Sequence, residues 1–185
     1  MKSNKIILIA LLIFTSYFTT KAQVQIEYDT CSYLNKYAGE WRYTNGQDTI
    51  RIYLKMQRTT MRTNGNDYDL IADDLWGWQE YKQGNTIIQS DYGGRLGNPF
   101  NNWNNMKSIS SITLSEKGYC SSSYKNLVGS ILDYSKGSEY HPVRVSMSTD
   151  GNTMYWHQEY RSGNGLDTGV LSGMTLPQEF TLIRQ

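Results

Sequence analysis

The sequence has few of the side chains that bind structural metals. Among 185 residues it holds two cysteines, Cys31 and Cys120, and two histidines, His141 and His157. A structural zinc ion takes four ligands, usually cysteines and histidines at short, regular spacings. These four residues show no such spacing, which excludes a zinc site of this kind. We expect the protein to hold no metal and no cofactor.

An excess of charge of one sign is also lacking. Lysine and arginine together number 18, aspartate and glutamate number 17, and the basic residues are scattered along the chain. Proteins that bind nucleic acid or an acidic membrane surface usually present a dense basic patch. The composition therefore excludes nucleic acid as an expected partner.

Long hydrophobic runs are absent except at the start of the chain. There, Lys2 and Lys5 precede an apolar stretch at residues 6–14. Residues 20–22 (TKA) then offer small side chains at the positions that a signal peptidase reads. This order is typical of a secretory signal peptide, and the stretch is well short of the roughly 20 residues that span a bilayer. We therefore expect residues 1–22 to be removed on export. One domain at 23–185, with no membrane span, would remain in the periplasm or outside the cell.

Export bears on the two cysteines. An even number of cysteines in an exported chain suggests a disulfide. A bond between Cys31 and Cys120 would close a loop of about 90 residues and stabilise the fold by about 4 kcal/mol in the chain-entropy model. Two buried free thiols are the alternative.

Helical periodicity is lacking too, and apolar and polar residues alternate instead. In 50–57 (IRIYLKMQ) the apolar side chains share one face, and 143–147 repeats the pattern before an Asp-Gly turn. This alternation is typical of half-buried strands, and Gly, Asn and Asp between them favour hairpins. The predicted strands are 40–44, 50–57, 68–72, 75–82, 86–92, 109–114, 127–134, 142–149, 153–161 and 179–184, with a short helix within 29–37. We expect an all-β fold, a single closed or nearly closed antiparallel β-barrel of about ten strands.

The segment 37–41 (YAGEW) resembles the lipocalin and calycin families, in which a Gly-x-Trp leads from a short helical turn into the first strand. The resemblance implies that Gly39 permits the bend and that Trp41 plugs one end of the barrel. It also implies that Arg184, at the end of the last predicted strand, packs across the Trp41 ring as a cation on an aromatic face. A core tryptophan in any all-β domain is the alternative.

A second resemblance is to short secreted lipocalin-like proteins of Bacteroidota. The shared features are a leader that ends in Lys-Ala-Gln, the early Gly-x-Trp with Tyr-Thr-Asn-Gly, an Asp-Thr-Ile strand, and a Leu-Pro before the last strand. This resemblance extends loosely over most of the chain. It implies a secreted barrel but no particular activity.

The sequence offers two weak candidates for catalysis. His157 and Glu159 share the polar face of one predicted strand, where they could form an acid-base pair or, as is more common, a solvated surface pair. Asp73 and Asp74 with Glu80 could be paired carboxylates of the kind that hydrolyse sugars, but adjacent aspartates also favour a turn. Because no nucleophile with a base is visible, we expect a protein that is not an enzyme.

Aromatic residues are plentiful, with 15 tyrosines and five tryptophans. Tyr and Trp line ligand cavities because they bury a large area and still offer a hydrogen bond. The candidate ligand-binding residues are Trp78, Met154, Trp156 and Tyr160 in the barrel wall, and Trp103 as a lid in the loop 93–107. The first hypothesis is a non-catalytic protein that binds a small apolar or amphipathic ligand inside the barrel. The second is a module that binds a protein or glycan on the outside of a filled barrel, and an enzyme is the third.

Overall fold

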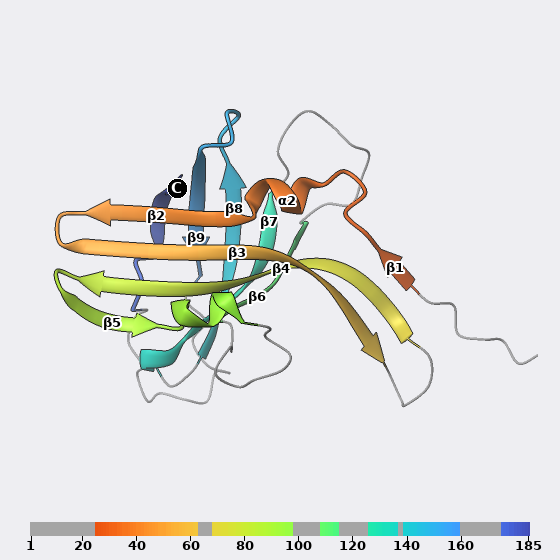
Figure 1. Ribbon diagram of the computed structural model, residues 1–185, viewed down its shortest axis with the longest axis horizontal. Helices are drawn as coiled ribbons and strands as arrows, with labels where there is room; N and C mark the ends of the chain where they lie inside the picture. Colours follow the sequence, from red (N-terminus) through yellow and green to blue (C-terminus); the bar gives the residue numbers. More distant parts are fainter. Residues whose placement is uncertain (1–24, 63–67, 98–107, 115–125, 137–138, 160–174) are drawn as a thin grey trace, which may run out of the picture.

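The computed structural model describes residues 25–62, 68–97, 108–114, 126–136, 139–159 and 175–185. Within these ranges most residues lie in β-strands (Figure 1). The strands are β1 (Gln25–Glu27), β2 (Gly39–Asn45), β3 (Asp48–Arg62), β4 (Tyr68–Gln83), β5 (Thr86–Ser90), β6 (Ile109–Leu114), β7 (Leu127–Asp133), β8 (Glu139–Met147), β9 (Thr153–Gln158) and β10 (Glu179–Arg184). The helices are α2 (Tyr33–Tyr37) and the single-turn 3-10 segments η1 (Tyr92–Leu96) and η3 (Tyr134–Lys136). The expected all-β class is confirmed.

Eight of these strands form one curled sheet in the order β4-β3-β2-β10-β9-β8-β7-β6. All pairs between them are antiparallel. Figure 1 shows β2, β3 and β4 running across the view while β8 and β9 stand nearly upright behind them. The sheet thus curls around its core as a half-barrel made of two strand groups.

The expected barrel of about ten strands, closed or nearly closed, is present only as a curled sheet of eight strands. The strands β1 and β5 pair only with β4, β1 in parallel and β5 antiparallel. They therefore lie outside the curled sheet of eight strands. The two strand groups meet at two narrow joints. At one, β2 pairs with β10 through two residue pairs, and at the other, β4 pairs with β6 at Leu75 and Gly77, with a register shift between them. The alternation of apolar and polar residues along a strand is local and can be read from the sequence. How many residues of two distant strands pair with each other cannot be read in this way.

The long strand β4 corrects a second expectation. The sequence predicts two strands separated by a turn at Asp73 and Asp74, but the structure has one continuous strand paired with β3 throughout. Asp73 is buried and accepts hydrogen bonds from the Arg58 guanidinium on β3 (2.9 Å from Nε). The Asp74 carboxylate accepts one from the Thr59 hydroxyl (3.2 Å). Partners on the neighbouring strand therefore hold the two aspartates in extended backbone.

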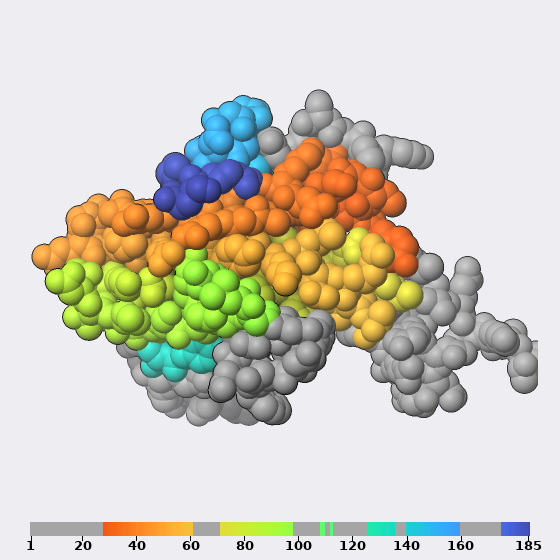
Figure 2. Space-filling model, viewed as in Figure 1, coloured from red at the N-terminus to blue at the C-terminus, as the bar shows by residue number. Residues whose placement is uncertain are grey.

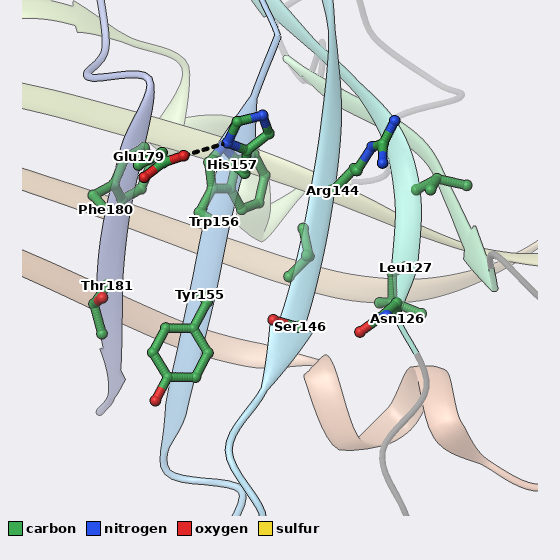
Figure 3. Close-up of a pocket in the computed structure, with 12 residues that line it drawn as sticks. Asn126, Leu127, Arg144, Ser146, Tyr155, Trp156, His157, Glu179, Phe180 and Thr181 are labelled. Atoms are coloured by element: carbon green, nitrogen blue, oxygen red, sulfur yellow. Dashed lines mark hydrogen bonds and ion pairs between the residues drawn. The ribbon is translucent and has the colours of Figure 1, made fainter.

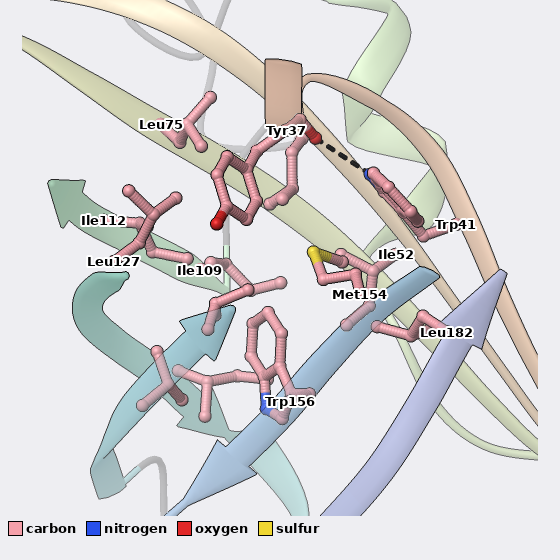
Figure 4. Close-up of a cluster of buried hydrophobic side chains, with 14 of the residues drawn as sticks. Tyr37, Trp41, Ile52, Leu75, Ile109, Ile112, Leu127, Met154, Trp156 and Leu182 are labelled. Atoms are coloured by element: carbon pink, nitrogen blue, oxygen red, sulfur yellow. Dashed lines mark hydrogen bonds between the residues drawn. The ribbon is translucent and has the colours of Figure 1, made fainter. Parts of the chain in front are cut away.

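The core lies on the concave side of the curled sheet. Alternate residues of each strand point into it, as in β3, where Ile50, Ile52 and Leu54 are fully buried. Figure 4 shows side chains from both strand groups and from α2 meeting there. Trp156 stacks on Phe180 with ring centroids 5.9 Å apart. Burying each large apolar side chain contributes about 1.5–3 kcal/mol relative to leaving it exposed, so this cluster is the main stabilising element.

Gly39, Trp41 and Arg184 come together where α2 leads into β2. Gly39 has a φ of +120°, which favours glycine, and lets the chain turn into the strand. The fully buried Trp41 ring lies under the Arg184 guanidinium, with 4.2 Å from Cζ to the ring centroid. Its indole Nε1 donates to the backbone carbonyl of Tyr37 at 2.8 Å (Figure 4). The contact that the sequence predicts between Arg184 and Trp41 is present.

The C-terminal strand closes over this corner. Figure 2 shows the last residues of the chain packed against β2 at the upper edge of the molecule. The pairing there joins Ile183 to Arg42 and Arg184 to Trp41. The corner that holds Trp41 is therefore also the joint between the two strand groups.

Candidate functional site

A hollow lies on the outer side of β7, β8, β9 and β10. It has a volume of about 610 Å³ and is open to solvent. Outward side chains from the four strands form two rows across it (Figure 3). The first row is Val128, Arg144, His157 and Glu179, and the second is Ser146, Tyr155 and Thr181, with Asn126 at the start of β7. We call this hollow the outer groove.

The alternating sequence of β9 positions the centre of the outer groove. In β9 (TMYWHQ), Met154 and Trp156 point into the core, so Tyr155 and His157 point outward. Tyr155 is 50% exposed although it is a large aromatic residue. It stands between Ser146 of β8 and Thr181 of β10, whose side chains are short and leave the Tyr155 ring accessible. The outer groove thus offers an aromatic face beside hydroxyl groups.

The charged side chains of the first row are paired with one another or with a neighbour. The His157 Nδ1 lies 2.8 Å from a carboxylate oxygen of Glu179, and Arg144 lies 3.1 Å from Glu159. The sequence suggests a pair of His157 with Glu159, and the structure instead gives each a partner on the adjacent strand. His157 lies directly opposite Glu179 in the ladder between β9 and β10, where side chains are close, and Arg144 reaches Glu159 diagonally from its position opposite His157. The outer groove therefore contains acidic and basic side chains that each lie beside a partner.

The expected interior ligand wall is only partly assembled. Met154 and Trp156 are fully buried in the core. Trp78 is also fully buried, but it lies on the opposite face of the sheet, paired with Tyr53 and with ring centroids 6.2 Å apart. Its neighbour Gly77 occupies the inward position on β4. The expectation that Trp78 shares a wall with the other two is wrong, since the register of β4 places it outward.

Two of the predicted ligand-binding residues, Tyr160 and Trp103, lie outside the described residues. An interior ligand site therefore stays a prediction. Described side chains from both strand groups pack against one another in the core. The gap among Gln79, Gln89, His141 and Gln158 at one end of the core is too narrow to hold a water molecule. The Gln79 amide spans this region and donates to the carbonyl of Leu132 at 3.0 Å.

A second, smaller hollow of about 320 Å³ lies over β2, β3 and β4. The Arg51 guanidinium is its central group and lies 2.7 Å from Glu40 and 3.5 Å from Glu80. The hydrogen bond from Arg51 holds the pKa of Glu40 below its usual value. The Arg51 Cζ also lies 4.3 Å from the Tyr92 ring centroid, and burial raises the pKa of Tyr92 to about 12. These pairings favour a structural role, since they fasten η1 to the sheet.

Asp91 is a buried carboxyl at the start of η1. Burial raises its pKa from 3.8 to about 6, although a hydrogen bond from the backbone N–H of Gln79 (2.6 Å) opposes this by stabilising the anion. Because the folded pKa lies above the unfolded one, the contribution of Asp91 to stability is fully present below 3.8. It is lost as the pH rises through about 6.

The Asp91→Asn variant tests this directly. We expect its free energy of unfolding to change with pH by about 2 kcal/mol less than that of the wild type across this interval. Urea unfolding at several pH values measures the difference. The control is Asp150→Asn, because Asp150 is in an exposed turn and its pKa is lowered by hydrogen bonds from Ser148 and Asn152. Equal pH profiles for Asp91→Asn and the wild type would contradict the assignment.

Several other expectations concern metals, membranes and cysteines. Among the residues that the structure describes, no group of three or more His, Cys, Asp or Glu side chains is placed to hold a metal ion. The same residues include no helix of sufficient length and apolarity to cross a bilayer. Cys31 is half-buried in the turn before α2, and Cys120 lies outside the described residues. The disulfide between them stays a prediction.

The fold and the outer groove define an all-β protein with a packed hydrophobic core and an open, partly aromatic hollow on its outer surface. The chain belongs to a family described as a family of unknown function (DUF6705), whose model matches residues 1–185. No curated protein and no solved structure matches the chain.

Proposed function

We propose that the protein is an exported, non-catalytic binding module that holds a neutral glycan in the outer groove. The observation that carries the proposal is the half-exposed ring of Tyr155 at the centre of a hollow of about 610 Å³. A solvent-exposed aromatic ring with hydroxyl neighbours suits a sugar, whose apolar face stacks on the ring while its hydroxyls find hydrogen-bond partners. Ser146 and Thr181 supply those hydroxyls on either side.

The charges of the outer groove favour a neutral ligand over an ionic one. His157 with Glu179 and Arg144 with Glu159 form local pairs, so each of these four groups already has a partner within the protein. The side chains in a row belong to neighbouring strands about 4.8 Å apart, close to the length of one pyranose ring. A short oligosaccharide lying across the strands would therefore meet one outward side chain for each sugar unit.

The burial of two predicted wall residues also favours the outer surface as the binding site. Met154 and Trp156, which the sequence suggests for an interior wall, are fully buried against other core side chains. The Gly39, Trp41 and Arg184 arrangement supports a lipocalin-like origin for the half-barrel. In this proposal the core supplies rigidity, and the outward residues of β8, β9 and β10 supply recognition.

Titration calorimetry with a panel of neutral oligosaccharides tests the proposal. For a sugar that binds the wild type, Tyr155→Ala is expected to weaken binding about tenfold, which corresponds to about 1.4 kcal/mol. Tyr155→Phe keeps the ring and should retain most of the affinity. The matched control is Tyr140→Ala, because Tyr140 is similarly exposed at 52% but does not line the outer groove. Binding that Tyr155→Ala leaves unchanged, or a panel without any binder, would overturn the proposal.

A further inference from the structure

The strand β10 has a free edge over part of its length. It pairs with β9 from Glu179 to Ile183, but with β2 only through Ile183 and Arg184. Figure 3 shows Glu179, Phe180 and Thr181 on the strand at the border of the group that forms the outer groove. Within the described part of the chain, no strand pairs with these three residues on the side away from β9.

The hydrogen-bond ladder determines which backbone groups point toward that side. Gln185 donates its backbone N–H to β2 at 3.0 Å, whereas Arg184 donates to the turn before β9, also at 3.0 Å. Successive residues of an antiparallel strand alternate in this way. The N–H and C=O groups of Glu179 and Thr181 therefore point away from β9. The backbone groups of Thr44 on β2 point toward Thr181 from the other side. The two residues do not pair, because the ladder between β2 and β10 ends at Ile183 and Arg42.

We propose that this edge of β10 binds an extended peptide segment of a partner protein by strand addition. An unpaired row of N–H and C=O groups is a template for another strand, and main-chain hydrogen bonds supply the affinity in such complexes. This interaction goes beyond the proposed binding of a glycan. The peptide lies along the edge of β10, whereas the glycan lies across the outer faces of four strands.

The side chains beside the edge define the chemistry of the peptide. Phe180 points inward and lies against Tyr43, with ring centroids 5.6 Å apart, so the peptide residue opposite Phe180 is apolar. Glu179 points outward, its side chain is 74% exposed, and His157 contacts only one of its two carboxylate oxygens, so the peptide residue opposite it is basic and pairs with the other oxygen. Opposite charges directly across a ladder are stabilising. The partner segment thus carries a lysine or arginine next to an apolar residue in an extended stretch without proline.

Selection from a displayed library of short random peptides against the intact protein tests the proposal. The selected peptides are then measured on two variants, Thr181→Pro and Thr181→Val. Proline removes the outward N–H of Thr181 but no hydrogen bond to β9, a position at which an edge strand tolerates proline. Valine keeps the N–H and nearly the same shape. Loss of the main-chain bonds is expected to weaken binding about tenfold for Thr181→Pro and hardly at all for Thr181→Val.

Amide hydrogen exchange gives a second readout that does not depend on the proline variant folding. On the wild type, a selected peptide is expected to slow exchange at Thr181 and Glu179. The proposal is overturned if no basic–apolar peptide is selected, if these two amides stay unprotected, or if Thr181→Pro and Thr181→Val bind equally well. It is also overturned if the peptides lose affinity only for Tyr155→Ala, which would place them in the outer groove. A dimer that Thr181→Pro dissociates in sedimentation would make a second copy the occupant and likewise refute a partner peptide.

Discussion

Replacing Gly129 with alanine is expected to lower the free energy of unfolding by about 3 kcal/mol. Gly129 of β7 lies against Ile112 of β6, and a Cβ added there would stand 2.5 Å from Ile112 Cγ1 and 2.7 Å from its Cα. The second of these atoms is backbone and cannot rotate away. The two strands would have to separate, which would weaken the joint where β6 returns to β4.

Urea unfolding measures this effect, and Gly93→Ala is the matched control. No atom lies within 4 Å of a Cβ added at Gly93, and its backbone is not in the left-handed region. Its stability should change by less than about 0.5 kcal/mol, as for most surface substitutions. A Gly129→Ala variant that unfolds at the same urea concentration as Gly93→Ala would show that β6 and β7 do not approach as closely as described.

Replacing Arg184 with alanine is expected to cost about 3 kcal/mol as well. Its guanidinium donates to three backbone carbonyls, those of Gly151 (3.1 Å from Nε), Ala38 (3.1 Å from Nη1) and Lys36. It also covers the Trp41 ring. Alanine removes these three hydrogen bonds and exposes the ring at the joint between β2 and β10.

The Arg184→Lys variant is expected to recover only part of the loss. Lysine keeps the positive charge but lacks the planar fork that reaches several acceptors at once. The control is Arg144→Ala, since its side chain is 70% exposed and makes one surface ion pair with Glu159. Such pairs contribute about 0–1 kcal/mol. If thermal unfolding shows equal losses for Arg184→Ala and Arg144→Ala, the corner does not depend on Arg184.

Much of the strand content could be predicted because alternation is written locally in the sequence. The predicted strands 109–114 and 179–184 have the same bounds as β6 and β10. In these two strands each residue's own neighbours in the chain decide its structure. The Gly39, Trp41 and Arg184 contact, which joins opposite ends of the domain, could be anticipated through the resemblance to the lipocalin and calycin families.

The candidate site could be predicted less well because it depends on pairing between distant strands. His157 and Glu159 are two positions apart on the same face of a predicted strand. The partner of His157 is instead Glu179, which lies opposite it on β10. The same limit applies to Trp78, since an alternating strand does not reveal which of its faces will be inward. Tyr155 left a usable signal, an aromatic residue on the polar face of a strand. That signal becomes informative only once Ser146 and Thr181 are known to flank it.

The two narrow joints divide the molecule into halves that are each built from sequence neighbours. The strands β2, β3 and β4 follow one another directly in the chain, as do β6 to β10 in the other half. Each half can therefore close its own short-range contacts at low entropic cost before the two come together. Each joint rests on two residue pairs, so we expect the backbone ladder to open locally at the joints at a lower free energy than complete unfolding, while the core shared by the two halves stays packed. This local opening should expose backbone amides beside Trp41 and beside Gly77 before those in the middle of each half.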